Sequence, residues 1–197
     1  MTKTLFVAPA LVRPALEPHL PDWLDTRWFA SKAEAMDLAP QAEIGWFDMI
    51  DKVAMGEAIG QATRLKWLHS IYAGLDGIPL DQLSAQGTLV SNGSGINAVT
   101  IAEYVVMGML VMAKGYRQVV RAQDAHEWLL DSPGKIELAG SKALLLGAGS
   151  IGGLIKTRLA AMDVAVTNVR RTPQSSDEIG PDDWRARLAE FDWIILA

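Results

Sequence analysis

The sequence has 197 residues, of which 50% are hydrophobic and 21% are charged, and it carries a formal net charge of −5. This composition is typical of a globular protein with one large or two small domains. Because neutralising phosphates takes clustered Lys and Arg, the acidic balance and scattered basic residues argue against nucleic acid or an acidic membrane as partner. The chain has no cysteine, which excludes disulfides, thiolate catalysis and cysteine-based metal sites and fits a cytoplasmic protein.

The first apolar run, Thr4–Val12, has some features of a secretory signal, but it is short, contains Pro9 and is followed by Arg13. We interpret it as a buried strand that ends in a turn. No apolar run in the sequence approaches the ~18 residues that a membrane span needs.

Short apolar runs alternate with helical spacing over the first ninety or so residues. The segment Met55–Leu65 shows helical spacing. The expected strands are Leu5–Ala8, Thr26–Ala30, Glu43–Phe47, Trp67–Ile71 and Thr88–Ser91. Such alternation predicts a parallel sheet of about five strands, covered on both faces.

A turn cluster, Asn92–Gly95, separates this region from two predicted helices. Asn97–Met112 is apolar nearly all round, which predicts a helix buried between two lobes. Tyr116–Trp128 is a second, more polar helix, and Ser132–Lys135 breaks the chain again.

A new domain pattern begins at Ser141. In chain order we expect the strand Lys142–Leu146, the helix Ser150–Met162, the strand Val164–Val169, the polar loop Thr172–Gly180, the helix Pro181–Glu190 and the strand Asp192–Ala197.

A G-x-G-x-x-G sequence, formed by Gly147, Gly149 and Gly152, lies between the first strand and the first helix of this region. In that context the first glycine permits a tight turn, the second lets a pyrophosphate approach the backbone, and the third lets helix pack on strand. The amides that open the helix at Ser150 and Ile151 would face the phosphates. The loop therefore predicts dinucleotide binding, although the same string can also be a purely structural turn.

Arg170, Arg171 and Thr172 follow the second strand, about twenty residues after the glycines, where an enzyme that binds NAD normally has Asp or Glu. A carboxylate repels a 2′-phosphate, whereas arginine offers it charge-assisted hydrogen bonds of about 1.5–3 kcal/mol each. The pattern favours NADPH over NADH. The alternative interpretation is a pair of solvated surface arginines.

Three stretches, in matching order and spacing, resemble the D-2-hydroxyacid dehydrogenase family. They are Leu65–Asp76, similar to a strand and Ala-Gly-Val-Asp loop; Asn92–Tyr104, similar to an Asn-x-x-Gly-x-Asn turn and Ala-Glu helix; and Leu138 through the glycine loop to the double arginine. The Arg-Arg-Thr ending is most similar to the glyoxylate/hydroxypyruvate reductase branch, which generally prefers NADPH.

The resemblance implies an α/β architecture with a flavodoxin-like substrate lobe, residues 1–97, and a Rossmann lobe, residues 98–197, incomplete at its end. It implies that a small 2-oxo or 2-hydroxy acid binds through its carboxylate to the backbone of Ala73-Gly74-Leu75, a turn suited to an anion nest, with Tyr72 beside it or merely packed. It further implies hydride transfer with NADP(H) and a homodimer formed through Asn97–Trp128. Where relatives have a glycine after the first Rossmann helix, this sequence has Asp163, which tolerates the left-handed conformation better than most residues.

Family catalysis uses an arginine, a glutamate and a histidine that follow the strand matched here by Asp192–Ala197. No catalytic residue can therefore be nominated, and of the three histidines only His69 lies near the expected substrate loop. We expect a fragment, a truncated product or half of a split enzyme, inactive alone and with an open last strand.

Two other classes remain open besides the oxidoreductase. A dinucleotide-sensing, corepressor-like regulator would be expected to show basic stretches or partner grooves, and none is evident. A methyltransferase would place an acidic residue where Arg170 stands.

Overall fold

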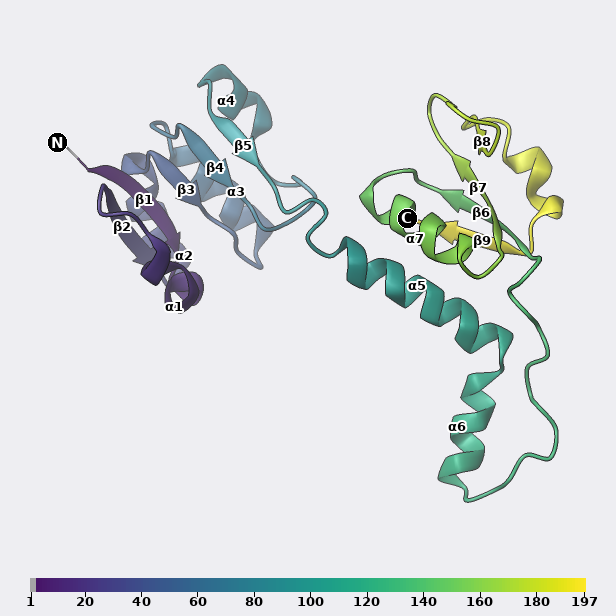
Figure 1. Cartoon of the computed structure of the whole chain (residues 1–197). Helices are drawn as coiled ribbons and strands as arrows, with labels where there is room; N and C mark the ends of the chain where they lie inside the picture. The colour runs from purple at the N-terminus through teal and green to yellow at the C-terminus, as the bar shows by residue number, and fades with distance from the viewer. Residues whose placement is uncertain (1–2) are drawn as a thin grey trace. The chain divides into compact units, whose positions relative to one another are not determined.

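The computed structural model describes residues 3–197, and the chain divides between Ser94 and Gly95 into two compact units (Figure 1). Each unit contains one parallel sheet with helices, which confirms the predicted α/β class. The elements of the first unit are β1 (Thr4–Pro9), η1 (Ala10–Val12), α1 (Arg13–Leu16), η2 (Glu17–His19), β2 (Leu24–Phe29), α2 (Lys32–Leu38), η3 (Ala39–Gln41), β3 (Ile44–Trp46), α3 (Lys52–Gln61), β4 (Trp67–His69), α4 (Leu80–Ala85) and β5 (Leu89–Ser91).

The first sheet has five parallel strands in the order β2-β1-β3-β4-β5. The five predicted strands are thus confirmed, with ends that differ by at most two residues. The order is that of flavodoxin-like folds, in which ligands bind beyond the carboxyl ends of the strands.

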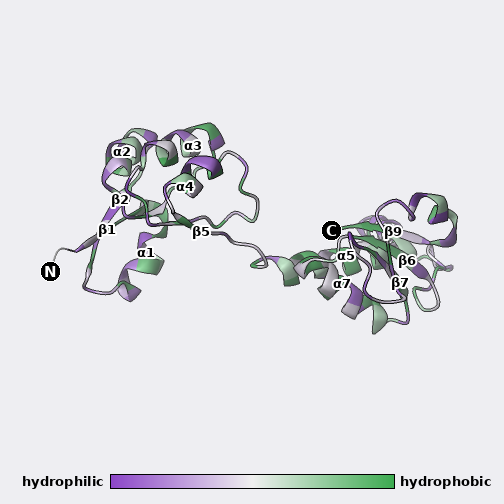
Figure 2. Cartoon of the chain, turned by 90° about the horizontal axis from the view of Figure 1, so that it is seen from above, coloured by the Kyte–Doolittle hydropathy of each residue, from purple (hydrophilic) through white to green (hydrophobic). Residues whose placement is uncertain are grey.

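Helices cover this sheet unequally. Figure 2 shows α2, α3 and α4 on one face and α1 on the other. The buried side chains between the helices and the sheet include Val7, Phe47, Met55, Leu68 and Leu83. The helices begin where the sequence provides caps: Ser31 Oγ accepts from the Glu34 amide at 3.2 Å, and Asp51 Oδ1 accepts from two amides of α3 at 3.0 Å.

The second unit builds a smaller sheet. Its elements are α5 (Ala98–Ala113), α6 (Tyr116–Asp124), β6 (Lys142–Leu146), α7 (Ser150–Ala160), β7 (Ala165–Val169), β8 (Glu178–Ile179), η4 (Arg185–Glu190) and β9 (Trp193–Leu196). The four strands are parallel, in the order β8-β7-β6-β9. This corresponds to strands 3-2-1-4 of a Rossmann fold, so the chain reverses direction across the sheet between β6 and β9.

One face of α5 packs against α7. Ala102, Met109 and Ala113 are buried with Ile155 and Leu159 of α7. The opposite face is exposed within this chain, where Tyr104, Met107 and Met112 are 65%, 50% and 64% accessible. The sequence predicted a helix buried between two lobes, and within the second unit one side of α5 has a partner.

Three expectations are corrected. The region Pro181–Glu190 contains a turn and the 3₁₀ helix η4 instead of an α-helix, and the loop Thr172–Gly180 contains the short strand β8. The predicted helix Tyr116–Trp128 ends at Asp124, and His126 adopts a left-handed φ of 56°.

No single helix in residues 3–197 has the length and apolar character to cross a membrane. The pair α5 and α6 meets those two criteria only when taken together, and the pair is bent by 73°.

The last strand has an open side. β9 is an edge of the second sheet, and its Ile194 and Leu196 are exposed.

Candidate functional site

The glycine loop joins β6 to α7 at the carboxyl end of the second sheet. Because β7 lies on one side of β6 and β9 on the other, this loop stands at the point where the strand order reverses. In open parallel sheets that point is where ligands bind. The topology therefore agrees with a dinucleotide site at the predicted loop.

The three positions of the loop require glycine for different structural reasons. Gly147 has a φ of +123°, and a Cβ there would lie 2.1 Å from the carbonyl oxygen of Ala197. A Cβ on Gly152 would lie 2.1 Å from the carbonyl oxygen of Gly147. Gly149 is different, because a Cβ there would meet no atom within 4 Å. Packing explains the first and third glycines, whereas the second keeps an open space at the helix start, which fits the close approach of a pyrophosphate.

The N-terminus of α7 is available to an anion. No side chain caps the helix at Gly149. The first amides of a helix, here beginning at Ser150 and Ile151, have no partner inside the helix and carry the positive end of its dipole. These groups can donate to phosphate oxygens.

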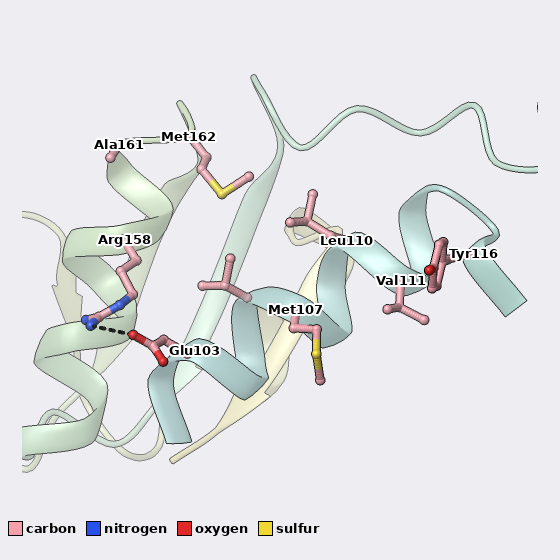
Figure 3. Close-up of a pocket in the computed structure, with 9 residues that line it drawn as sticks. Glu103, Met107, Leu110, Val111, Tyr116, Arg158, Ala161 and Met162 are labelled. Atoms are coloured by element: carbon pink, nitrogen blue, oxygen red, sulfur yellow. Dashed lines mark ion pairs between the residues drawn. The ribbon is translucent and has the colours of Figure 1, made fainter. Parts of the chain in front are cut away.

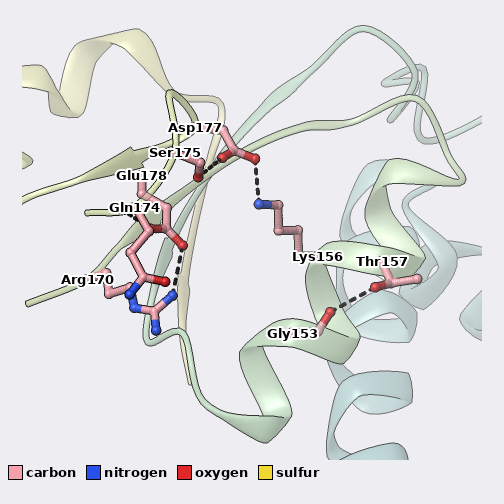
Figure 4. A network of polar contacts seen from close by, with 8 residues as sticks. All are labelled: Gly153, Lys156, Thr157, Arg170, Gln174, Ser175, Asp177 and Glu178. Atoms are coloured by element: carbon pink, nitrogen blue, oxygen red, sulfur yellow. Dashed lines mark hydrogen bonds and ion pairs between the residues drawn. The ribbon is translucent and has the colours of Figure 1, made fainter. Parts of the chain in front are cut away.

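The loop after β7 holds the predicted arginines and a carboxylate that the sequence did not point out. Arg171 and Thr172 are exposed, and Arg170 is half-buried. Glu178 on β8 forms an ion pair with Arg170, with Nη1 and Oε1 3.2 Å apart (Figure 4). Spacing alone does not indicate this pair, because it depends on the strand β8, which the sequence did not predict.

The turn between α7 and β7 keeps its expected shape. Asp163 has a φ of 56°, which confirms the predicted left-handed conformation in place of the family's glycine. Its amide donates to the carbonyl of Ala160 at 3.1 Å, so the turn closes regularly.

In the first unit, the loop after β4 presents free backbone donors. Within residues 3–197, no hydrogen bond uses the amides of Ala73, Gly74 or Leu75. Asn92, which follows β5, holds the loop in place, because its Nδ2 donates to the carbonyl of Ala73 at 2.7 Å. Successive free amides in an exposed turn can hold an anion.

Asp48 organises the start of that loop. Its carboxylate accepts hydrogen bonds from Trp46 Nε1 at 2.7 Å, from Ser70 Oγ at 2.7 Å and from the Ile71 amide at 2.6 Å. Asp48 was not among the residues that the sequence indicated, although a polar residue directly after a predicted strand, at the carboxyl edge of the sheet, is a usable signal.

Tyr72 belongs to the packing of the first unit. Its ring packs against the core, its hydroxyl donates to the Met49 carbonyl at 3.3 Å, and the ammonium of Lys52 lies over the ring. The side chain therefore supports the loop through packing and a cation–π contact.

The histidines take ordinary structural positions. His69 Nδ1 lies 3.1 Å from Ser91 Oγ, and its ring contacts Trp46 edge-on. His19 and His126 are exposed. In the part of the chain that the structure describes, no group of His, Asp and Glu is arranged to hold a metal ion.

Comparison with known proteins places these features in a family. Residues 106–197 match the model of the D-isomer specific 2-hydroxyacid dehydrogenase, NAD binding domain. The chain is 34% identical over 152 residues to the formate dehydrogenase, chloroplastic/mitochondrial, of Arabidopsis thaliana, covering 71% of this chain and 38% of that protein. It is 26% identical over 148 residues to the D-3-phosphoglycerate dehydrogenase of Mycobacterium leprae, covering 66% of this chain and 28% of that protein.

A solved D-isomer specific 2-hydroxyacid dehydrogenase family protein from Aeromonas salmonicida has the same fold, with a TM-score of 0.80 at 22% identity over 100% of this chain and 64% of that one. The chain thus spans less than two fifths of the two curated relatives and about two thirds of the solved structure. The glycine loop and the strand order that carries it agree with the matched domain. Residues 106–197 therefore form an NAD binding domain of the D-isomer specific 2-hydroxyacid dehydrogenase family.

Proposed function

We propose that this protein is an NADPH-preferring reductase of small 2-oxo acids of the glyoxylate or hydroxypyruvate type. The observation that carries the proposal is the exposed Arg171, one of two arginines after β7, on the sheet whose glycine loop leaves space at Gly149. An acidic residue would stand after β7 in a pocket that favours NADH. NADPH, when bound, supplies the hydride.

The residues of this chain bind the nucleotide and orient it. The open space at Gly149 admits the pyrophosphate, and the amides at Ser150 and Ile151 donate to it. Arginine and the hydroxyl of Thr172 suit a 2′-phosphate because they donate hydrogen bonds and, for arginine, add positive charge. NADH has no 2′-phosphate and cannot form these contacts, so they favour NADPH.

The substrate carboxylate binds to the amides of Ala73, Gly74 and Leu75. This loop is supported by Asp48 at its start and by Asn92 from the next strand's end, so its free amides are already ordered. A preorganised turn of this kind selects acids over neutral ketones.

The cofactor preference is tested by fluorescence titration of the chain with NADPH and NADH. We expect NADPH to bind at least about tenfold more tightly, which corresponds to about 1.4 kcal/mol. Equal affinities would refute the preference, and failure to bind either nucleotide would refute the reductase proposal.

The substrate site is tested by NMR titration with glyoxylate. We expect amide shifts at Ala73, Gly74 and Leu75, and their loss in Gly74→Val, because a branched side chain crowds the turn, where a Cβ would already lie 3.0 Å from Asp76. Acetone is the control, since it has a carbonyl and no carboxylate. Equal responses to glyoxylate and acetone, or an unchanged response in the variant, would argue against this site.

We also propose a homodimer formed through α5, α6 and the segment after them. Besides the exposed face of α5, Trp128 and Leu130 are 87% and 97% accessible. A cavity of about 590 Å³ adjoins this surface, lined by residues of α5, the start of α6, and the end of α7 with the turn after it, among them Met107, Tyr116 and Met162 (Figure 3). Exposed apolar side chains gathered in this way are typical of an interface.

Light scattering after size-exclusion chromatography checks the dimer. We expect a dimer for the chain, a monomer for Met107→Glu, and a dimer for the control Leu11→Glu, which adds the same charge at an exposed apolar site of the first unit. A wild-type monomer at high concentration would contradict the proposal.

A further inference from the structure

The segment between β7 and β8 is held closed by Glu178. The side chain of Glu178 is only 8% exposed, and both of its oxygens have donors within the chain. Oε1 lies 3.2 Å from Arg170 Nη1, and Oε2 accepts the amide of Gln174 at 2.7 Å (Figure 4). The amide of Arg170 also donates to the carbonyl of Ile179 at 3.0 Å. The carboxylate therefore ties the start of the segment to its end.

A second carboxylate anchors the same segment to α7. Asp177 forms an ion pair with Lys156 and accepts a hydrogen bond from Ser175 Oγ (Figure 4). The hydrogen bonds from Lys156 and Ser175 lower the pKa of Asp177 to about 2. The segment is thus fixed at two points, by Glu178 to Arg170 and by Asp177 to α7, the helix whose start carries the glycine loop.

The two neighbouring arginines differ in whether their charge is already paired with a carboxylate. Glu178 is nearly buried, and a buried carboxylate that loses its only cationic partner is strongly destabilising. Arg170 is the only cation within ion-pair distance of Glu178 in residues 3–197, so its charge is committed to that pair. Arg171 is exposed and forms no ion pair with any residue in the described range.

We propose that Arg171 is the residue that determines specificity for the 2′-phosphate of NADPH, while Glu178 holds Arg170 as a positioning residue and limits the preference for NADPH. This rests on the proposed function. An anion that drew Arg170 away would leave Glu178 unpaired, and the negative charge of Glu178 would oppose that anion at short range. Arg171 carries no such penalty.

The test measures the affinity for NADPH and for NADH, together with the thermal midpoint, in four variants of the chain. Arg171→Ala is expected to weaken NADPH binding at least tenfold, with NADH affinity within twofold and an unchanged midpoint. Arg170→Ala is expected to lower the midpoint and to weaken both nucleotides to a similar extent. Glu178→Gln keeps the shape and the acceptor for Gln174 but frees the charge of Arg170, so NADPH should gain at least threefold over NADH. Arg64→Ala, which removes an exposed arginine of the first unit, is the control and should change neither ratio nor midpoint.

The inference is overturned if Arg171→Ala keeps the preference, if Arg170→Ala alone abolishes it without a fall in midpoint, or if folded Glu178→Gln shows no gain. If Glu178→Gln does not fold, the two arginine variants decide. A wild-type chain without any preference refutes the proposed cofactor choice. In that case, a preference for NADPH that appears in Glu178→Gln still supports the role of Glu178. If Glu178→Gln also shows no preference, both the cofactor choice and the role of Glu178 are refuted.

Discussion

The glycine loop allows a sharp prediction, because its glycines serve separate purposes. Substituting alanine at Gly147 should cost stability, whereas substituting alanine at Gly149 should cost binding. The distinction comes from the surroundings: the backbone of Ala197 crowds the first position, and open space faces the second. A loop that is only a structural turn would not separate the two effects.

The size of each effect follows from the geometry. An alanine at 147 would have to adopt a φ of +123°, at about 1–3 kcal/mol, and would force the backbone at Ala197 to move, at about 1–3 kcal/mol more. The sum of about 2–6 kcal/mol lowers the thermal midpoint of a unit of this size by about 8 °C or more. Gly149 has a φ of −79°, which alanine adopts freely. The substitution Gly149→Ala stabilises the fold by about 0.4–1 kcal/mol, because it lowers the entropy of the unfolded chain. It also destabilises the fold, because alanine caps a helix less well than glycine. The two effects oppose each other, so the thermal midpoint should stay within about 4 °C of the wild-type value.

Thermal unfolding and NADPH titration of both variants check the prediction. Gly149→Ala should keep its midpoint and lose at least about tenfold in NADPH affinity, since the new methyl group occupies the space of the pyrophosphate. Gly153→Ala is the matched control, because its Cβ also meets nothing within 4 Å but lies one turn further into the helix. Unchanged NADPH affinity in Gly149→Ala, or equal loss of stability in both variants, would refute the reasoning.

Three further outcomes are expected. Because Lys156 and Ser175 lower the pKa of Asp177 to about 2, below its ordinary value of 3.8, its pairing stabilises the folded chain above about pH 4 and is lost as the pH falls through 2. Asp177→Asn should therefore lower the thermal midpoint at pH 5, and the effect should become smaller as the pH approaches 2. Asp48→Ala removes an acceptor of three hydrogen bonds and should cost about 2–4 kcal/mol in urea unfolding, with changed NMR shifts at Ile71. Thr88→Val removes a buried hydroxyl that donates at 2.7 Å to a backbone carbonyl and should cost about 1–3 kcal/mol by the same assay, and a cost near zero would contradict the bond's role.

The sequence predicted the elements that bury apolar side chains at a regular period. β1 and β6 contain short apolar runs whose middle residues are buried, and β7 alternates buried with less buried residues. Both sheets have the α/β arrangement that the alternation of strands with helices indicated. The glycine loop was found because its spacing is tied to one strand and one helix. Local pattern and tertiary structure agree in these regions.

The remaining features depend on contacts that period and spacing do not encode. The 3₁₀ helix η4 has no buried residue, so no packing stabilises an α-helix there. The pair Glu178–Arg170 exists because β8 brings the two residues together across a loop. For α5, hydrophobicity showed that partners are needed but not where they lie, and only one face finds a partner within the chain.

The contact between Gly147 and the carbonyl of Ala197 links the phosphate-binding turn to the edge of the sheet. The amide of Ala197 donates to the carbonyl of Leu146 at 3.0 Å, directly before that turn. Fraying at the end of β9 therefore removes the backbone against which the turn packs. Strand edge and turn then open and close as one cooperative segment. A nucleotide that orders the turn would slow amide exchange along β9, at residues that it never touches.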